Sequence, residues 1–227
     1  MIFVIVPAYN EEKSIGRVLG GFFETQFKDE SLKNMKVVVV DDGSVDNTVQ
    51  IANQAGATVL RHEINRGQGA ALQTGNEYAL EQGASIVVHF DADGQFNPVD
   101  IESGLMAMKN KGVDVVLGSR FLDNRSKMPW SKKYLLLPIS RFVNRLLTGL
   151  KLTDAHNGFR ILSRKALQKI NISQDRMAHN SEIVKQIKQH NLLFAEHPVE
   201  VVYTEYGQGV GGGLKILQDL LAAKFLR

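Results

Sequence analysis

The sequence predicts an α/β fold with a mainly parallel sheet flanked by helices. Short apolar runs alternate with segments of helical periodicity over residues 1–118, and this order is typical of a parallel sheet between helices. Several runs are continuous stretches of Val and Ile, as expected for strands covered on both faces. The expected strands are Ile2–Val6, Val37–Val40, Thr58–Arg61, Ile86–Phe90 and Val113–Leu117.

The segments between these strands carry helical patterns. Apolar residues from Ile15 to Phe23 recur at i, i+3, i+4, i+7 and i+8, which places them on one helix face. A glycine follows each of the next three helices, where a C-terminal cap is favoured. These helices are expected at Asp46–Ala55, Gln68–Gln82 and Pro98–Lys111, before Gly56, Gly83 and Gly112.

The pattern changes after residue 118. Residues 119–133 form a basic, loop-like stretch, and Tyr134–Leu150 is apolar with helical spacing. The hydroxyl of Ser163 is expected to cap a short helix. The later expected elements are a strand at Gly158–Leu162, helices at Ser163–Ile170 and Ser181–Gln189, one or two strands within Leu192–Tyr203, the glycine-rich stretch Gly207–Gly213 and a final helix at Leu214–Leu226.

Composition narrows the class of protein. The 227 residues carry 27 Lys and Arg against 24 Asp and Glu, and the net charge of +3 is too small to indicate a nucleic-acid partner. The absence of cysteine excludes disulfides and thiolate metal sites, and it fits a cytoplasmic protein. No apolar run reaches the roughly 18 residues that a transmembrane helix needs. The first residues do not match a signal peptide.

Three of the expected strands end in polar residues that would meet at one edge of the sheet, where ligands bind in such folds. The four aspartates there, two after each of two strands, repel one another unless a cation or hydrogen-bond donors neutralise them. An Asp-x-Asp turn suits Mg²⁺ or Mn²⁺. The alternative is that Asn10 or Ser44 only caps the helix that follows it, and that the aspartates only form turns. The polar residues are Asn10, Glu11, Asp41, Asp42, Ser44, Asp91, Asp93 and Gln95.

The segment Asn65–Gly69 (NRGQG) opens an expected helix and is similar to a glycine loop that binds phosphate. It is not a dinucleotide fingerprint, because the G-x-G-x-x-G pattern fails at Leu72. Two interpretations stay open: the glycines contact substrate, or they allow close packing of the helix.

The motifs PAYNEE, VVVVDDGSVDNT, NRGQGAALQTG, DADGQ, GSRF and NGFR, in that order, resemble family 2 glycosyltransferases with the GT-A fold. They are most similar to the polyprenyl-phosphate sugar transferases, the dolichyl-phosphate mannose synthase and glucosyltransferase branch. The resemblance covers roughly residues 1–205. It implies one Rossmann-like GT-A domain over 1–227, with a nucleotide-sugar half at 1–118 and a smaller α+β acceptor half at 119–227.

The resemblance also implies roles for individual residues. Asp91, Asp93 and Gln95 would hold Mg²⁺ or Mn²⁺, and Arg120 would bind the acceptor phosphate together with Lys132 and Lys133. The implied donor-binding residues are Pro7, Ala8, Tyr9, Glu11, Val40, Asp42, Gly69, Asp91, Ala92 and Asp93.

A lipid phosphate acceptor is already ionised at neutral pH, since its second pKa is about 6, so it needs positioning more than deprotonation. The expected reaction is inverting transfer of a hexose from a GDP-mannose or UDP-glucose type of donor to polyprenyl or dolichyl phosphate. The expected catalytic residues are Asp93 and Arg120. If a base is needed, Glu182 and Asp154 are the candidates.

The stretch Tyr134–Leu150 is either a core or subunit-interface helix, or a helix lying on an anionic membrane surface, with Arg141 and Arg145 on its polar face. The final helix could also contact the membrane or form a homodimer. We therefore expect a peripheral protein on the cytoplasmic face of a membrane. After Tyr203 no basic residue occurs before Lys215, where relatives commonly carry Arg and Lys, so this loop is not expected to contact the diphosphate in the usual way.

The motifs leave other functions open beside transfer to a polyprenyl phosphate. A family 2 transferase with a polysaccharide, glycolipid or protein acceptor is the main alternative, and a non-catalytic nucleotide-sugar-binding protein is a remote one. A haloacid-dehalogenase type of phosphatase also uses Asp-x-Asp. It would carry the motif on the first strand, with Thr where this chain has Gln95.

Overall fold

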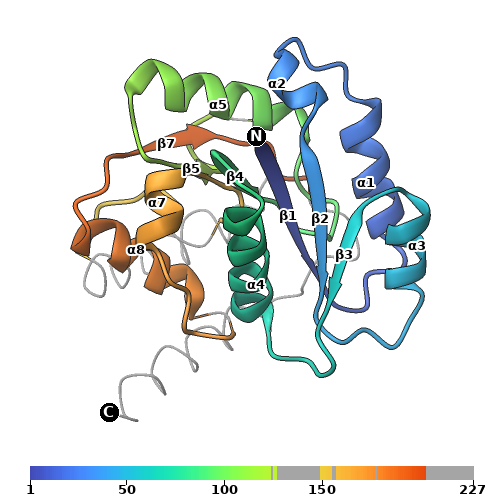
Figure 1. Cartoon of the computed structure of the whole chain (residues 1–227). Helices are drawn as coiled ribbons and strands as arrows, with labels where there is room; N and C mark the ends of the chain where they lie inside the picture. Colours follow the sequence, from blue (N-terminus) through green and yellow to red (C-terminus); the bar gives the residue numbers. More distant parts are fainter. Residues whose placement is uncertain (124, 127–148, 155–156, 177, 203–227) are drawn as a thin grey trace.

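The computed structural model describes residues 1–123, 125–126, 149–154, 157–176 and 178–202. Within them, seven strands form one sheet in the order β3-β2-β1-β4-β6-β5-β7, between two layers of helices (Figure 1). The strands are β1 Ile2–Ala8, β2 Lys36–Asp41, β3 Thr58–Arg61, β4 Ile86–His89, β5 Val115–Ser119, β6 Arg160–Ser163 and β7 Phe194–Pro198. The helices are α1 Ile15–Glu24, α2 Glu30–Lys33, α3 Thr48–Gln54, α4 Gln68–Glu81, α5 Val99–Lys111, α7 Arg164–Lys169 and α8 His179–Gln189.

The sheet is parallel except for β6, which runs antiparallel to both of its neighbours, β4 and β5. The expected mainly parallel sheet is therefore confirmed. The strand order adds a feature that the sequence did not predict, because β6 comes from the second half of the chain and separates two strands of the first half. Residues after 119 thus extend the same sheet through β6 and β7.

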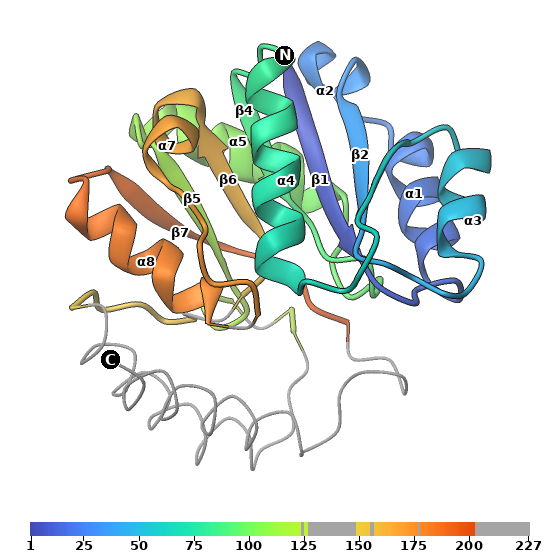
Figure 2. The ribbon, with the colours of Figure 1, turned by 60° about the horizontal axis from the view of Figure 1, so that its bottom comes forward.

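The strand β1 shows how the two layers are held. Val4 and Val6 point into the core beneath α1, α3 and α5, whereas Phe3 and Ile5 point into the core beneath α4, α7 and α8. Successive side chains of a strand face opposite sides, so a continuous apolar run is buried on both. Figure 2 shows α4, α7 and α8 on the same face of the sheet.

Several element boundaries differ from the expected ones. The helix α3 begins at Thr48 because the Asp46 carboxylate accepts a hydrogen bond from the Thr48 N–H (3.0 Å) and forms a turn before it. The strand β5 begins at Val115, two residues late, because the N–H of Val113 still bonds to Met108 at the end of α5. The cap of α7 is confirmed, since the hydroxyl of Ser163 accepts a hydrogen bond from the N–H of Ala166.

Some expected elements lie outside the described residues. These are Gly207–Gly213, the helix at Leu214–Leu226, and the apolar stretch Tyr134–Leu150 apart from its last two residues. Within the part that the structure does describe, no helix is long and apolar enough to cross a membrane.

Candidate functional site

The carboxyl ends of β1, β2 and β4 meet at one edge of the sheet, since these three strands are adjacent and parallel. β1 and β2 end side by side, with Ala8 paired to Asp41, and β4 ends at His89, which pairs with Ile5 of β1. The turns after the three strands therefore lie together, as the sequence predicted. This edge is where open parallel sheets bind their ligands.

The two acids of the Asp-x-Asp turn are each held by one polar group. Gln68, at the start of α4, donates its side-chain amide to Oδ1 of Asp91 (2.9 Å), and the backbone N–H of Gln95 donates to Oδ1 of Asp93 (2.9 Å). Burial raises the pKa of Asp91 to about 7, and the neighbouring charge of Asp93 adds to this. Burial also raises the pKa of Asp93. The turn thus concentrates negative charge that the protein alone does not fully compensate.

A divalent cation fits this donor set. No group of three or more His, Cys, Asp or Glu that could hold a metal occurs among the described residues. The carboxylates of Asp91 and Asp93, with the amide of Gln95, would thus supply only part of a coordination shell. Mg²⁺ and Mn²⁺ prefer oxygen ligands, and Mg²⁺ usually keeps several waters or substrate phosphate oxygens. The residues present therefore suit a metal that is shared with a phosphorylated substrate.

Glu11 lies at the same edge and adds to its negative charge. Its carboxylate accepts a hydrogen bond from the hydroxyl of Ser14, and its backbone N–H donates to the hydroxyl of Thr48 (2.8 Å). Burial, with a contribution from Asp93, raises the pKa of Glu11 even though the bond from Ser14 opposes the shift. Glu11 thus belongs to the electrostatic surroundings of the Asp-x-Asp turn.

The acids at the end of β2 have partners within the protein. Asp41 is buried and accepts hydrogen bonds from the Ser44 N–H, with Arg61 Nε 3.3 Å from its Oδ2. Of the four carboxylates expected to repel one another, this one is neutralised by its own chain.

Asp42 organises the turn before α4. Its two oxygens accept hydrogen bonds from the backbone N–H groups of Arg66 (2.9 Å) and Gly67 (2.6 Å), and Nδ1 of His62 lies 2.8 Å from Oδ1. Asp42 was expected to contact the donor. Its carboxylate holds the backbone of the turn that borders the cavity, and the expected donor contact stays a prediction.

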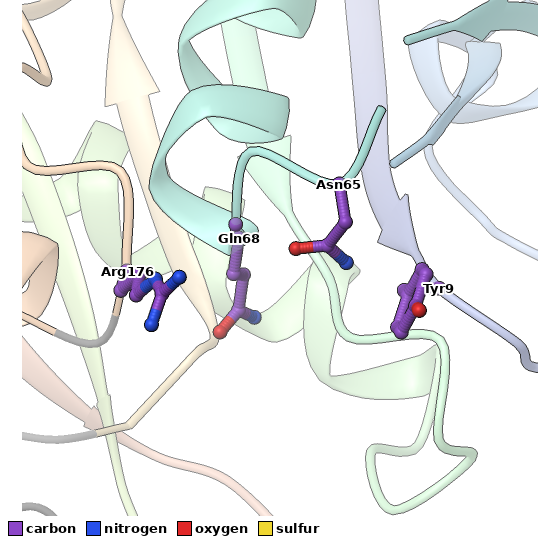
Figure 3. Close-up of a pocket in the computed structure, with 5 residues that line it drawn as sticks. Tyr9, Asn65, Gln68 and Arg176 are labelled. Carbon is purple, nitrogen blue, oxygen red and sulfur yellow. The ribbon is translucent and has the colours of Figure 1, made fainter. Parts of the chain in front are cut away.

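A cavity of about 510 Å³ opens beside this edge and is lined by Tyr9, Asn65, Gly67, Gln68 and Arg176. Its volume is in the range of small-molecule sites. In the view of Figure 3, Asn65 and Gln68 lie between Tyr9 and Arg176. Gln68 also bonds to Asp91, so a residue of the cavity lining is in direct contact with the Asp-x-Asp turn.

The apolar donor-binding candidates are buried. Val40 is fully enclosed in the core beneath α4, and Ala8 and Ala92 are enclosed in the core beneath α1. Pro7 is buried in β1. These side chains pack in the interior, whereas Tyr9 is 47% exposed and lines the cavity.

Gly69 was expected to contact the donor or to allow close packing. Its N–H donates to the carbonyl oxygen of Asp175 (2.7 Å), and a methyl group on its Cα would lie 2.0 Å from the carbonyl oxygen of Gln174. The packing interpretation is therefore the one that the structure shows. The expected phosphate contact is disfavoured, because this N–H already has a protein acceptor.

Arg120 and Asp154, both expected to be catalytic, form an ion pair. Arg120 Nε lies 2.7 Å from Oδ2 of Asp154, and a second guanidinium nitrogen lies 2.8 Å from Oδ1. Burial opposes ionisation of Asp154, but the attraction of Arg120 outweighs it and lowers the pKa of this carboxyl. A carboxylate held in this way is a weak base. The geometry favours a role for Asp154 in orienting Arg120.

Glu182, the other candidate base, is bound to the loop that precedes α8. Its carboxylate accepts hydrogen bonds from the N–H groups of Ser173 (3.0 Å) and Gln174 (2.9 Å) and from the Ser173 hydroxyl. These three bonds favour a structural role over the expected role as base. Lys132 and Lys133 lie outside the described residues.

Sequence reasoning missed two arginines of this region, Arg160 and Arg176. Arg160 is 2% exposed and donates to the side chain of Asn180, and burial lowers its pKa to about 10 although Asp91 and Asp154 oppose the shift. Arg160 lies in the NGFR motif, which was a usable signal. Arg176 stands in no motif.

Comparisons with known proteins identify the family. Residues 3–171 match the model of glycosyl transferase family 2, and the chain belongs to this family. A UDP-N-acetylglucosamine–dolichyl-phosphate N-acetylglucosaminyltransferase of Methanococcus voltae is 34% identical, over 99% of this chain and 96% of that protein. A polyprenol monophosphomannose synthase of Mycolicibacterium smegmatis is 28% identical, over 91% of this chain and 78% of that protein.

Solved structures confirm the fold. Glucosyl-3-phosphoglycerate synthase from Mycobacterium tuberculosis, in complex with Mn²⁺, UDP-glucose and phosphoglyceric acid, superposes with a TM-score of 0.70 at 18% identity. The match covers 98% of this chain and 79% of that one. The protein is thus a glycosyltransferase with the GT-A fold, similar to the polyprenyl-phosphate sugar transferase branch, as its motifs predicted.

Proposed function

We propose that the enzyme transfers a sugar from a nucleoside diphosphate donor to a polyprenyl or dolichyl phosphate. The observation that carries this proposal is the pair Asp91 and Asp93 beside a cavity of about 510 Å³, joined to it through Gln68. A small cavity beside concentrated negative charge suits a donor whose diphosphate arrives with a divalent cation. The acceptor class is supported by the relatives named for dolichyl and polyprenol phosphates.

The donor is proposed to be a UDP-sugar or GDP-mannose. The relative that covers nearly the whole chain at 34% identity is named for UDP-N-acetylglucosamine, which makes this donor the first to assay. UDP-glucose and GDP-mannose follow, since the motifs resemble transferases of both kinds.

In the proposed reaction, an oxygen of the acceptor phosphate forms a bond to the anomeric carbon. The bond from that carbon to the donor diphosphate breaks, its electron pair leaves with the diphosphate, and the anomeric configuration inverts. No general base is required, because a phosphate monoester with a second pKa of about 6 is ionised at neutral pH. Arg120, oriented by Asp154, would bind the acceptor phosphate. A divalent ion at Asp91 and Asp93, with Gln95, would compensate charge on the leaving diphosphate.

The test is transfer of labelled sugar from each donor to a polyprenyl phosphate, with and without Mn²⁺ or Mg²⁺. Transfer should require the metal and should be lost in Asp93→Ala. Asp29→Ala is a matched control, because it also removes one carboxylate but lies at the exposed start of α2. A product with retained anomeric configuration would exclude the single displacement. If the sugar is transferred only to a polysaccharide, a glycolipid or a protein, the proposed acceptor class is wrong and that molecule is the acceptor.

Peripheral association with the cytoplasmic face of a membrane belongs to the same proposal, because a polyprenyl phosphate acceptor resides in a bilayer. The apolar stretch with Arg141 and Arg145 supports it. Flotation with anionic and neutral vesicles tests it, and absence of binding to both would contradict it.

A further inference from the structure

A loop from the second half of the chain lies against the turn that borders the cavity. The carbonyl oxygen of Asp175 accepts the N–H of Gly69 at the start of α4 (2.7 Å). A methyl group on Gly67 would come within 2.3 Å of the same oxygen. The two glycines therefore allow residues 174–176 to approach the backbone of this turn closely. Because Asp175 occupies the N–H of Gly69, that amide is not available to a phosphate.

The same loop is fixed from its other side. Glu182 of α8 accepts hydrogen bonds from the N–H groups of Ser173 and Gln174. The carbonyl oxygen of Arg176 accepts the N–H of His179 (3.1 Å) and lies 2.8 Å from its Nδ1. The backbone of Arg176 is thus held between the start of α4 and the start of α8.

The side chain of Arg176 lines the cavity together with Tyr9, Asn65 and Gln68 (Figure 3). Within the described parts of the chain, its guanidinium makes no hydrogen bond or ion pair. An exposed arginine without a partner is often simply solvated. Here, however, the carbonyl oxygens of Asp175 and Arg176 are both hydrogen-bonded, and the side chain of Arg176 faces a cavity of about 510 Å³.

The charges around the cavity indicate that a phosphorylated substrate needs a cation there. Asp91 and Asp93 repel a phosphorylated substrate in the absence of a cation. Arg120 is already paired with the carboxylate of Asp154. Among the described residues, no acceptor occupies the N–H donors of the Arg176 guanidinium, and these donors match the oxygens of a phosphate in geometry.

From this arrangement we propose that Arg176 binds a phosphate oxygen of a substrate in this cavity, and that Glu182 holds the loop that positions it. The inference rests on the proposed function for its substrates. The phosphate belongs either to the diphosphate of the donor or to the monophosphate of the lipid acceptor. Arg176 would thereby supply a cation that residues 203–214 lack.

The experiment compares Arg176→Ala and Arg176→Lys with the wild type. Lys185→Ala serves as a matched control, since it removes one positive charge from the exposed face of α8. In the donor arm, calorimetry measures binding of UDP and GDP with Mn²⁺, and of uridine and guanosine, which lack phosphate. In the acceptor arm, sugar transfer gives KM and kcat for geranyl phosphate.

Loss of a hydrogen bond to a charged group predicts a weakening of about tenfold to a hundredfold for the substrate whose phosphate Arg176 binds. In the donor arm this means weaker binding of UDP or GDP, with binding of the nucleosides unchanged. In the acceptor arm it means a higher KM for geranyl phosphate. Arg176→Lys should restore part of the loss, because it keeps the charge without the two-pronged geometry.

The inference would be overturned if Arg176→Ala and Lys185→Ala gave the same binding of UDP and GDP and the same KM for geranyl phosphate. Equal weakening of nucleoside and nucleoside diphosphate would overturn it too, because that result indicates a change of pocket shape. If transfer to polyprenyl phosphate fails in the wild type but UDP or GDP binding still depends on Arg176, the proposed acceptor is wrong and the inference stands. If transfer occurs and is lost in Asp93→Ala, while Arg176→Ala changes neither the binding of UDP and GDP nor the KM for geranyl phosphate, the proposed function stands and the inference falls.

Discussion

Arg120 and Asp154 are joined by two side-chain hydrogen bonds of 2.7 and 2.8 Å, and the backbone N–H of Arg120 donates a third to the same carboxylate (3.1 Å). Asp154 is only 6% exposed, and Asn157 donates to it as well. The pair therefore ties the end of β5 to the segment that leads into β6. It holds a guanidinium at the edge where the proposed acceptor phosphate would bind.

Replacing Arg120 by Met should destabilise the protein strongly. The change leaves Asp154 buried without its cation, and removal of one partner of a buried pair costs about 3–5 kcal/mol. Urea denaturation measures the free energy of unfolding. Asp154 has a lowered pKa in the folded protein, so its stabilising contribution is present at neutral pH and is lost as the pH falls through that value. The difference between wild type and variant should therefore shrink in acid, and a pH-independent difference would contradict this account.

Kinetics can distinguish a positioning role of Glu182 from a role as general base. If Glu182 only positions the loop at Ser173 and Gln174, Glu182→Ala should raise KM or weaken UDP binding with little change in kcat. The effect should not add to that of Arg176→Ala, because both changes remove the same contact. A large fall in kcat in Glu182→Gln, with loss of the acidic limb of the pH–rate profile, would restore Glu182 as a base.

The parts of the fold set by local pattern could be predicted from the sequence. The Val and Ile runs identify β1, β2 and β4, because a strand buried on both faces has little choice of composition. Ser163 and Gly112 mark the start of α7 and the end of α5 for equally local reasons. Adjacent parallel strands then bring Asp91 and Asp93 to the edge that was expected.

Features that depend on contacts distant in sequence could not be predicted in this way. The insertion of β6 between β4 and β5 is decided by packing of the whole sheet. The bonds of Asp42 to His62 and to the turn before α4 link three segments, and no single segment signals them. Arg176 lines the cavity from a loop that is hydrogen-bonded to Glu182 and to Gly69, two residues distant from each other in the sequence. A lone arginine in a loop carries no pattern.

Gly69→Ala should destabilise the protein although alanine favours helices. In an unconstrained helix interior the change would stabilise by about 1 kcal/mol. At Gly69 the methyl group would collide with the carbonyl oxygen of Gln174, so the loop must move. Gly20→Ala in α1 is the matched control, since its methyl group would lie 3.7 Å from Glu24, an ordinary contact. Thermal unfolding should shift in opposite directions, and stabilisation by both changes would contradict the close packing at Gly69.

His89 should make the protein less stable in mild acid. Burial, with Arg160 and His179 nearby, holds the pKa of this imidazole well below its ordinary value of 6.5. The unfolded chain takes up a proton below about pH 6.5 that folded His89 does not, so the free energy of unfolding falls as the pH falls through that range. His89→Leu, which also removes a ring nitrogen without a partner among the described residues, should flatten this dependence. An unchanged slope between about pH 5 and 6.5 would contradict the assignment.

Nucleotide and metal should stabilise the protein together, because the pair Asp91 and Asp93 supplies only part of a coordination shell and a diphosphate would complete it. At a ligand concentration about 100 times Kd, binding adds about 2.7 kcal/mol, which corresponds to a rise in Tm of about 5–10 °C for a chain of this size. The measurement is thermal unfolding with Mn²⁺, with UDP or GDP, and with both. Asp93→Asn should remove most of the joint shift, whereas Asp29→Asn should not, since Asp29 caps the exposed helix α2. A shift with UDP or GDP that survives EDTA and Asp93→Asn would place the diphosphate away from this turn.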